Sequence, residues 1–295
     1  MPVIRRTERR QKSGCLVMPA ATGVDYGFLR RIVYSISQNV LEPSCDTLFD
    51  TRLSRLLQSL GMTELEELVQ YLRLRRNPSL ERAIAEAMTI NETSFFRDAR
   101  PFELLRTELL PQLIEQRRLS RGLRFWSAAS STGQEAYSIA MLLREHFPLL
   151  TGTGWNIRIE GTDFASEVVE RARLGRFHRI EMNRGLPARY LVRYFDRVKD
   201  EWIAKPELRS LCHFRQANLC SVPLPFHERF DVIFLRNVML YFSHQDRVTL
   251  LAALHPLLAP DGVLFLGVGE QPPDAALWQA VLAGGTCYFR PRPGL

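Results

Sequence analysis

LRFWSAASSTGQEAY, residues Leu123 to Tyr137, contains the most informative change of pattern in the chain. Leu123 to Trp126 is a short apolar and aromatic run. Small residues follow it as far as Gly133, and Gln134 to Phe147 then has the pattern of a helix. A buried strand that passes through a turn of small residues into a helix is typical of an open α/β sheet. Ligands bind such sheets beyond the carboxyl ends of the strands, so we expect a nucleotide-like ligand at this turn.

The turn favours one kind of ligand. It lacks the three spaced glycines that cradle a pyrophosphate and the Gly-Lys-Ser/Thr ending of a P-loop. Glu135 would repel a phosphate but attract a cation, and S-adenosylmethionine carries an ammonium and a sulfonium. A second predicted strand, Asn156 to Gly161, leads to Asp163, where an acid can accept hydrogen bonds from a ribose diol. Alternatively, Glu135 and Asp163 are only a helix-start acid and a turn residue.

Length and charge limit the other possibilities. The 295 residues are enough for two compact domains or for one large domain with additions. With 46% hydrophobic and 24% charged residues, the chain can form a sizeable core. There is no run of about eighteen apolar residues, so we expect no membrane insertion. Residues 1–24 predict a basic, disordered tail. Its five basic residues and one acid hold +4 of the formal net charge of +7, which leaves about +3 for the remainder and demands no nucleic-acid-binding face.

Cysteine and histidine patterns argue against metal chemistry. The five cysteines include no C-x-x-C pair, and the six histidines show no metal-ligand spacing with one another or with the cysteines. We therefore expect no metal site. An odd number of unpaired thiols fits a reduced protein in the cytoplasm.

Residues 25–88 predict a small helical recognition domain of four short helices. One of them is Leu48 to Leu60, which ends before Gly61, and the next begins at a capping box formed by Thr63 and Glu66. Arg52 and Arg55 lie three residues apart and would share a helix face, either as a binding surface or simply as solvated charge.

The linker at residues 89–100 has the sequence TINETSFFRDAR, which is unusual because it holds two adjacent phenylalanines among polar residues. A linker with buried aromatics is expected to press against a site instead of acting as a free hinge. Pro101 then begins a helix that extends to about Arg118.

The remaining chain, residues 101–295, predicts an α/β fold with a doubly wound, mostly parallel sheet, because strands alternate with helices. FDVIFL at Phe230 to Leu235 is the most strand-like run and should be central. Two or three short antiparallel strands are expected as an insertion within Asp200 to Ala217. The other expected elements are helices at Ala165–Leu174, Pro187–Phe195 and His244–Leu258, a strand at Val263–Val268, and a final edge strand at Thr286–Arg290.

The end of the FDVIFL strand argues against methylation of nucleic-acid bases. Methyltransferases that act on the amino groups of nucleic-acid bases carry an Asn/Asp-Pro-Pro-aromatic motif there, whereas this chain has Arg236, Asn237, Val238 and Met239. The missing motif argues against base methylation.

Six blocks in order resemble the CheR family of chemotaxis receptor methyltransferases, over roughly residues 25 to 290. The blocks are NETSFFRD (Asn91 to Asp98), WSAASSTGQEAYSIA (Trp126 to Ala140), GTDFASEVVERAR (Gly161 to Arg173), FRQANL (Phe214 to Leu219), FDVIFLRNVMLYF (Phe230 to Phe242) and DGVLFLGVGE (Asp261 to Glu270). The resemblance implies methyl transfer from S-adenosylmethionine to glutamates on the cytoplasmic helices of bacterial chemoreceptors, leaving S-adenosylhomocysteine. It also implies a cytoplasmic enzyme with a helical domain, a cofactor domain of the class I methyltransferase type, and an inserted β-subdomain, here at about residues 198–217.

The resemblance also carries over site residues by position. The expected cofactor contacts are Asn91, Thr93, Arg97, Ala129, Glu135, Asp163, Asn218, Leu219, Arg236 and Asn237. Glu135 would bind the methionine ammonium, Asp163 the ribose, and Asn218 with Leu219 the adenine edge. Arg97 and Tyr241 match residues beside the transferred methyl, although Arg97 could instead be a pure cofactor contact.

The helix that holds Arg52 and Arg55 should supply the receptor-docking face, with Asp46 and Asp50 diluting its basic character.

Two departures from the family pattern qualify the expected function. Gln134 and Ala136 stand where the family usually has Glu and Pro, which would alter loop stiffness. The connection Arg197 to Glu201 is short and lacks the Gly-x-Gly of members that tether to a receptor's C-terminal pentapeptide, so we expect no tight pentapeptide binding. The alternatives are a methyltransferase acting on a small molecule or RNA, and a non-catalytic adaptor that binds cofactor to shape an interaction surface.

Overall fold

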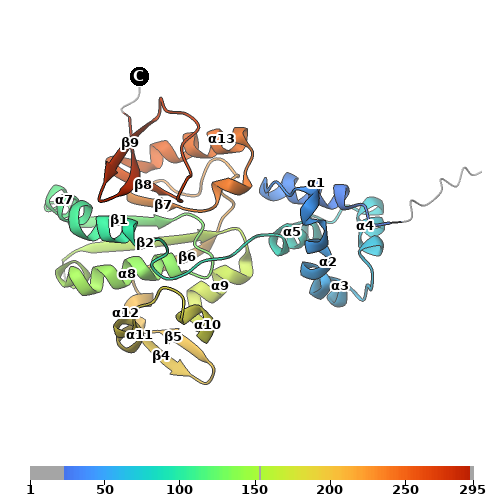
Figure 1. Cartoon of the computed structure of the whole chain (residues 1–295), viewed down its shortest axis with the longest axis horizontal. Coiled ribbons are helices and arrows are strands. Elements are labelled where there is room, and N and C mark those ends of the chain that lie inside the picture. Colours follow the sequence, from blue (N-terminus) through green and yellow to red (C-terminus); the bar gives the residue numbers. More distant parts are fainter. Residues whose placement is uncertain (1–22, 153, 293–295) are drawn as a thin grey trace, which may run out of the picture.

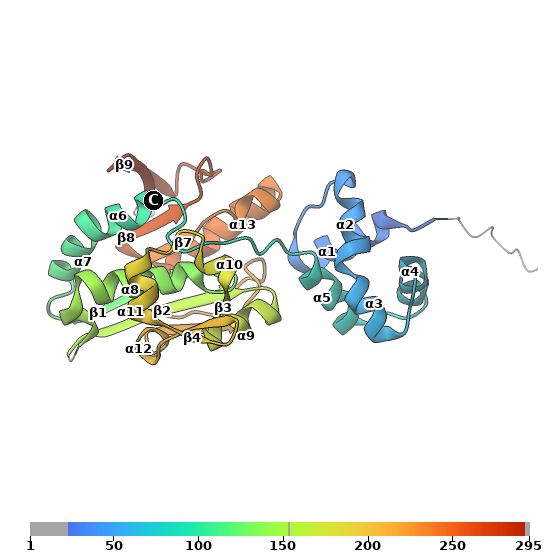
Figure 2. The same ribbon diagram turned by 60° about the horizontal axis from the view of Figure 1, so that its bottom comes forward.

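The structure, a computed structural model, describes residues 23–152 and 154–292, so the prediction for the tail falls mostly outside the described residues. A helical region (residues 25–88) lies beside a larger α/β region (residues 100–292), and the extended junction (residues 89–100) connects them (Figures 1 and 2). Among the described residues, no helix has the length and apolar character needed to cross a bilayer.

The helical region contains five α-helices instead of the four predicted: α1 (Tyr26–Ser37), α2 (Asp46–Arg52), α3 (Ser54–Leu60), α4 (Leu65–Leu74) and α5 (Pro78–Ala87). The prediction of one helix from Leu48 to Leu60 was wrong, because the helix breaks at Leu53, whose ψ is −4°. Leu53 remains fully buried in the same core as Phe49 and Leu57. Since the apolar periodicity continues across the break, the sequence pattern does not reveal it.

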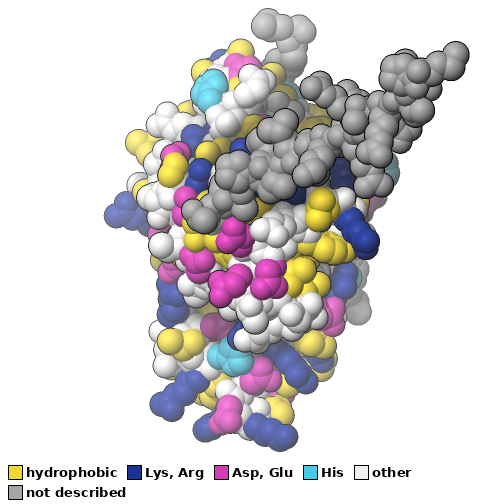
Figure 3. Space-filling model, turned by 90° about the vertical axis from the view of Figure 1, so that its right-hand side faces the viewer, with side chains coloured by type: hydrophobic (Ala, Val, Ile, Leu, Met, Phe, Trp, Pro, Cys, Tyr) yellow, Lys and Arg dark blue, Asp and Glu magenta, His cyan; other side chains and the backbone are white. Residues whose placement is uncertain are grey.

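The capping box at Thr63 was also wrong. The first helical residue of α4 is Leu65, its N-cap is Glu64, and no side chain caps it. The Thr63 hydroxyl lies one residue too early and donates to the Glu67 carboxylate at 3.1 Å. The end of the helical region mixes acidic, basic and hydrophobic side chains on the described surface seen in Figure 3.

The α/β region is built on a seven-stranded sheet of order β6-β2-β1-β7-β8-β10-β9. Its strands are β1 (Gly122–Ser127), β2 (Asn156–Asp163), β6 (Cys212–Gln216), β7 (Phe230–Leu235), β8 (Leu258–Leu266), β9 (Trp278–Ala283) and β10 (Thr286–Pro291). The first five of these in sheet order are parallel, whereas β10 is antiparallel to both of its neighbours. Every residue of β7 is buried, as predicted for a central strand.

Helices cover both faces of this sheet, which confirms the doubly wound α/β class. Alternate residues of β7 face opposite sides: Val232 and Phe234 belong to one core, and Ile233 and Leu235 to another. The first core is covered by α6 (Arg100–Leu104), α7 (Leu110–Gln116), α8 (Gln134–His146) and α9 (Ser166–Leu174), and the second by α13 (His244–Leu254). A π-helical turn at Leu105–Leu109 joins α6 to α7, so the helix predicted from Pro101 to about Arg118 is present.

The inserted antiparallel sheet exists, but it begins earlier than predicted. It consists of β3 (Arg176–His178), β4 (Phe195–Val198) and β5 (Glu201–Ala204) in the order β3-β5-β4, with the short helices α10 (Arg179–Met182), α11 (Ala188–Tyr194) and α12 (Pro206–Arg209) around it.

Residues 212–216, predicted as part of the insertion, instead form β6, which is parallel to β2. In β6 the Phe214 ring lies so close to Gly161 that a Cβ there would be 2.3 Å from it. β6 is an edge strand, so its buried residues alternate with more exposed ones. A strand of an antiparallel insertion has the same pattern, so the sequence did not distinguish the two.

The C-terminal strands also differ from the prediction. β8 begins at Leu258 instead of Val263, because Asp261 and Gly262 lie inside the strand at a shift in its register with β7. β9 was missed, and it displaces β10 from the edge of the sheet. Only Trp278 of the six residues of β9 is buried, so the strand lacks the apolar run by which a buried strand is recognised. The helix predicted from His244 to Leu258 ends at Leu254 and is followed by a 3-10 turn.

Candidate functional site

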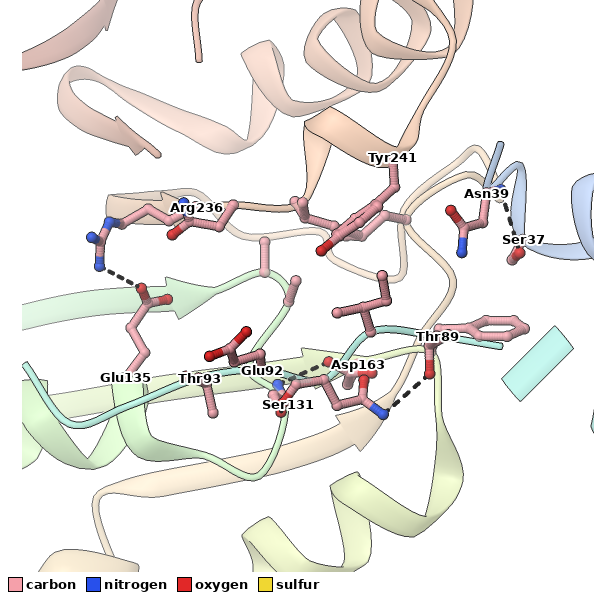
Figure 4. A pocket seen from close by; sticks show the side chains of 18 of the residues that line it. Ser37, Asn39, Thr89, Glu92, Thr93, Ser131, Glu135, Asp163, Arg236 and Tyr241 are labelled. Carbon is pink, nitrogen blue, oxygen red and sulfur yellow. Dashed lines mark hydrogen bonds and ion pairs between the residues drawn. The ribbon is translucent and has the colours of Figure 1, made fainter. Parts of the chain in front are cut away.

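A cavity of about 930 Å³, counting the part open to solvent, lies beyond the carboxyl ends of β1, β2 and β7 (Figure 4). It is lined by all ten residues predicted to contact a cofactor, and by Tyr241. The sequence analysis did not single out several further lining residues: Ser37, Asn39, Thr89, Ile90, Glu92, Ser94, Ala128, Ser131, Phe164, Ala217, Val238 and Phe242. Two of these, Ser37 and Asn39, come from the helical region, so both regions build the cavity.

The turn after β1 is held by Asp163 from the neighbouring strand. Its carboxylate accepts hydrogen bonds from the backbone N–H of Ser131 at 2.8 Å and of Ala165 at 3.1 Å. Ser131 and Gly133 both have positive φ, so the turn curves tightly before α8 begins. Burial raises the pKa of Asp163 above its ordinary value, although the backbone donors oppose this shift. The carboxylate therefore joins the ends of two strands and still faces the cavity.

Glu135, in the first turn of α8, lies at one end of the cavity. It accepts hydrogen bonds from the Ser127 hydroxyl at 2.7 Å and from the Arg236 guanidinium at 3.2 Å. Burial raises the pKa of Glu135, and the positive charge of Arg236 opposes that shift. A carboxylate in this position has a strong preference for a cationic ligand, because a second positive charge compensates its desolvation.

Arg236 links three segments at the same end. Its side chain is 2% exposed, and besides Glu135 it binds the Asp98 carboxylate at 2.6 Å and the backbone oxygen of Arg97 at 2.9 Å. Since Arg236 follows β7 directly, this one guanidinium fixes the junction to the sheet and to α8 (Figure 4).

The junction is pressed against the site, as its aromatic composition predicted. Phe95 is fully buried and packs edge-on against Phe177 and Phe195 of the inserted sheet. The next residue, Phe96, has positive φ and donates its backbone N–H to the Ser138 hydroxyl at 2.9 Å. The junction thus runs across α8 on its way to α6, and one wall of the cavity is irregular backbone held at both ends.

A carboxylate that the motif reasoning did not single out, Glu270, holds the segment after β7. It accepts hydrogen bonds from the backbone N–H of Asn237 at 2.9 Å, Gly267 at 2.7 Å and Leu240 at 3.3 Å. A Cβ at Gly267 would lie 2.7 Å from the Asn237 nitrogen, so only glycine permits this approach. The signal was present in the block DGVLFLGVGE, which ends at Glu270, but the motif did not indicate a role for it.

Tyr241 and Arg97 both line the cavity, and the charge of Arg97 acts on the Tyr241 phenol. The Tyr241 ring projects into it from the 3-10 turn Met239–Tyr241 (Figure 4). Burial raises the pKa of Tyr241, while the charge of Arg97 acts on the phenol in the opposite direction. Arg97 donates to the Glu92 backbone oxygen at 3.1 Å and has no salt bridge among the described residues. Its remaining donors are therefore available to an anion next to the Tyr241 hydroxyl.

The opposite end of the cavity joins the two regions through neutral groups. The Asn218 side chain donates to the backbone oxygen of Ile36 at 2.7 Å and accepts from the Cys220 N–H at 3.0 Å. The backbone N–H of Val40 donates to the backbone oxygen of Tyr241 at 2.8 Å. Asn218 and Leu219, both predicted to contact adenine, line this end of the cavity, and the Asn218 side-chain amide is already hydrogen-bonded within the protein.

Arg52 and Arg55 do not line this cavity. They lie on a separate open groove between α2, α3, α5 and the start of α9, and this groove shares Thr89 and Asn91 with the cavity. Arg52 donates to the Thr89 backbone oxygen at 2.8 Å, whereas Arg55 is exposed and makes no salt bridge within the described part of the chain.

The two acids expected to dilute the basic character of this helix both have partners. Asp46 pairs with Arg30, and Asp50 accepts a hydrogen bond from the Tyr26 hydroxyl at 3.0 Å. Within residues 23–152 and 154–292, no group of three or more His, Cys, Asp and Glu side chains could hold a metal ion.

Comparison with known proteins agrees with this arrangement. Residues 91–285 match the family described as "CheR methyltransferase, SAM binding domain". The chain is 36% identical over 253 residues to chemotaxis protein methyltransferase 1 of Pseudomonas aeruginosa, covering 85% of this chain and 91% of that protein. It is 37% identical over 225 residues to chemotaxis protein methyltransferase Cher2 of Pseudomonas putida (76% and 81%), and 35% identical over 246 residues to the chemotaxis protein methyltransferase of Escherichia coli (82% and 82%).

The doubly wound sheet with its inserted antiparallel strands, the helical region and the cavity at the strand ends define a class I methyltransferase that depends on S-adenosylmethionine. The chain belongs to the CheR family of chemotaxis methyltransferases, as its sequence blocks predicted.

Proposed function

We propose that the protein transfers a methyl group from S-adenosylmethionine to glutamate side chains on the cytoplasmic helices of chemoreceptors. The products are glutamyl methyl esters and S-adenosylhomocysteine, and the reaction takes place in the cytoplasm. One observation carries the proposal: the cavity combines a largely buried carboxylate suited to a cation at one end with Arg97, which has no salt bridge among the described residues, and a Tyr241 hydroxyl.

The residues present suit the cofactor. Glu135 would hold its ammonium and Asp163 its ribose hydroxyls, with Asn91, Thr93 and Ala129 completing the walls. The Asn237 side-chain oxygen is buried in the wall without a hydrogen-bond partner among the described residues, so it can accept from a bound donor. When bound, S-adenosylmethionine supplies an electrophilic methyl group on a sulfonium.

The protein's own residues have a modest chemical task. A glutamate carboxylate is already ionised near neutral pH, so no general base is required. Arg97 orients the incoming carboxylate by a charge-assisted hydrogen bond, and Tyr241 restricts its angle through the hydroxyl. The raised pKa of Tyr241 keeps the phenol protonated, as a donor must be. The cavity removes part of the water from the carboxylate and so makes it a better nucleophile.

Arg97 separates this mechanism from its alternatives. We expect Arg97→Ala to lower kcat about a hundredfold with a smaller change in cofactor affinity, because the charge-assisted hydrogen bond that orients the substrate carboxylate is lost. Wild-type turnover in this variant would assign Arg97 to cofactor binding or to structure alone. A titration of S-adenosylhomocysteine by calorimetry is the control, since it separates loss of binding from loss of turnover.

Arg55 is proposed to contact the receptor. It is exposed on the groove that adjoins the cavity and has no partner among the described side chains, whereas Arg52 is tied to Thr89. Arg55→Ala should raise KM for receptor about threefold and leave cofactor affinity unchanged, as expected for a solvent-exposed charge. Arg118→Ala, an exposed arginine on the far side of α7, is the matched control. Equal effects of the two substitutions would remove Arg55 from the receptor surface.

The inserted sheet supports independence from a receptor pentapeptide. Val198 pairs with Glu201, so β4 and β5 are joined by a turn of only Lys199 and Asp200. β4 is an edge strand of the inserted sheet, but so tight a turn provides no loop that could hold a peptide against that edge. Calorimetry with a receptor C-terminal pentapeptide should detect no binding at micromolar concentrations, and tight binding would contradict this part of the proposal.

The central experiment is transfer of radiolabelled methyl from S-adenosylmethionine to membranes containing this organism's chemoreceptors. We expect label on a receptor band that mild base releases as methanol, which is diagnostic of a methyl ester. Cofactor binding without label on any receptor would favour the non-catalytic adaptor. Label on a small molecule or RNA, or label that resists base, would favour a different substrate.

A further inference from the structure

Asn39 is an unexpected polar residue in the cavity wall. It follows α1 in the helical region, is 6% exposed, and its side-chain oxygen has no hydrogen-bond partner within the described residues. Figure 4 shows this oxygen pointing into the cavity at the end opposite Glu135. A buried acceptor without a donor costs free energy unless a ligand supplies one.

The backbone of Asn39 is fixed independently of its side chain. Asn39 forms an antiparallel bridge with Phe242, and the neighbouring Val40 N–H donates to the backbone oxygen of Tyr241 at 2.8 Å. The Asn39 N–H is 3.4 Å from the Ser37 hydroxyl, which itself donates to Val33. These contacts fix the backbone of Asn39 and leave its side-chain oxygen free for a ligand.

The other amide at this end is already engaged. Asn218 was expected to contact adenine, but its side chain donates to Ile36 and accepts from Cys220. It therefore holds the end of α1 against the loop after β6, and Asn39 and Leu219, which follow α1 and β6, both line the cavity.

The order of groups along the cavity indicates what Asn39 faces. Glu135 lies at one end, Asp163 follows, and Asn39 lies beyond Asp163 (Figure 4). If Glu135 binds the ammonium and Asp163 the ribose, the remaining part of the cofactor is the base. An amide oxygen accepts well from the 6-amino group of adenine, which is how Asn and Gln distinguish adenine from other bases.

We propose that Asn39 accepts a hydrogen bond from the 6-amino group of the cofactor's adenine. The helical region thereby determines base specificity, in addition to any role in receptor recognition. This inference rests on the cofactor placement of the proposed function but not on the identity of the methylated substrate. Because one backbone bridge holds both Asn39 and Tyr241, base recognition and the position of the phenol are coupled.

A double-mutant cycle tests the contact. Its two ligands are S-adenosylhomocysteine and the analogue whose base is unsubstituted purine, which lacks only the 6-amino group. Calorimetry measures the affinity of both for wild type and for Asn39→Leu. We expect removal of the amino group to weaken binding to wild type about tenfold, or ~1.4 kcal/mol, and to weaken binding to Asn39→Leu less than twofold.

Two further variants keep the result interpretable. Asn39→Asp retains an acceptor and should retain discrimination, so it rescues the test if the leucine variant unfolds. Gln38→Leu removes a neighbouring amide that does not line the cavity and should behave as wild type. An equal loss of affinity in wild type and in Asn39→Leu on removing the amino group would overturn the inference. Neither outcome depends on receptor methylation, so failure of the proposed substrate is recognised separately.

Discussion

The two ends of the cavity are built on different physical principles. At the Glu135 end, an arginine that is almost completely buried joins two carboxylates and the junction, all within residues 97–236. At the Asn39 end, neutral amides and backbone groups join the helical region to the sheet. We therefore expect the charged end to bind its part of the cofactor strongly, with an affinity that depends on pH. We expect the neutral end to contribute less binding free energy and to select the ligand by its shape and hydrogen-bonding pattern.

Removing Arg236 should have the largest effect. Arg236→Met leaves Glu135 and Asp98 without their common counter-charge, and one of them is buried. We expect the free energy of unfolding to fall by ~3 kcal/mol or more at pH 8, measured by urea denaturation. The loss should shrink toward pH 5, because Glu135 can then be protonated and no longer remains a buried, unpaired charge.

Arg118→Met is the control for this prediction. Arg118 is 69% exposed and, among the residues that the structure describes, forms a salt bridge only with Glu115, so its loss should change stability by less than ~0.5 kcal/mol. A similar effect of both substitutions would mean that Arg236 acts as an ordinary surface charge, and the contrast between the two ends would fail.

Glu135→Gln should have the next largest effect, on cofactor binding. The substitution keeps the shape but removes the negative charge, so affinity for S-adenosylmethionine should fall roughly thirtyfold, or ~2 kcal/mol. Arg236 loses one partner and keeps Asp98. Isothermal titration calorimetry measures the affinity, and a loss below threefold would show that Glu135 does not contact the ammonium.

The pH dependence of wild-type binding follows from the same carboxylate. Burial raises the pKa of Glu135, so the folded protein without ligand binds more protons than the unfolded chain above pH 4.5. Stability of the free protein therefore falls as pH rises through this window, whereas cofactor affinity rises because the ammonium requires the ionised form. Glu135→Gln should remove most of this dependence, and what remains reports Asp163, whose pKa is raised as well.

The fold could be predicted where periodicity and composition coincide. The buried run at Phe230–Leu235 and the small-residue turn before Gln134 each indicated one element without competition. The helix break at Leu53 and the parallel pairing of β6 were not predictable, because apolar positions continue unchanged through the first and an edge strand resembles a hairpin strand in the second. Both depend on tertiary contacts that no local pattern encodes.

The turn and the second strand alone indicated Glu135 and Asp163, and the family blocks supplied the other predicted residues of the cavity. The blocks brought Glu135, Asp163 and Arg236 to one cavity. Asn39 could not be found, because none of the six blocks covers the segment after α1, and its backbone bridge is to Phe242, about two hundred residues away in the sequence. The hydrogen bond from the Asn218 side chain to Ile36 could not be predicted for a related reason, because Ile36 belongs to another region of the chain.

Tyr241 lies between the two ends and should show an intermediate effect on turnover. Tyr241→Phe keeps the ring but removes the hydroxyl that restricts the substrate carboxylate, so kcat should fall about tenfold with cofactor affinity unchanged. The assay is methyl transfer to receptor membranes at saturating S-adenosylmethionine. Unchanged kcat would reduce Tyr241 to a lining residue, and weakened cofactor binding would indicate that its hydroxyl supports the neutral end.

Asn218→Ala should have the smallest effect and distinguishes the two ends most directly. It removes the amide that holds Ile36 against the loop after β6, so affinity for S-adenosylhomocysteine should fall about fivefold, or ~1 kcal/mol. Because neither partner titrates, the loss should be the same at pH 6 and pH 8, unlike that of Glu135→Gln. A loss that grows with pH would mean that the neutral end senses the charge of Asp163, and that the two ends of the cavity act as one electrostatic unit.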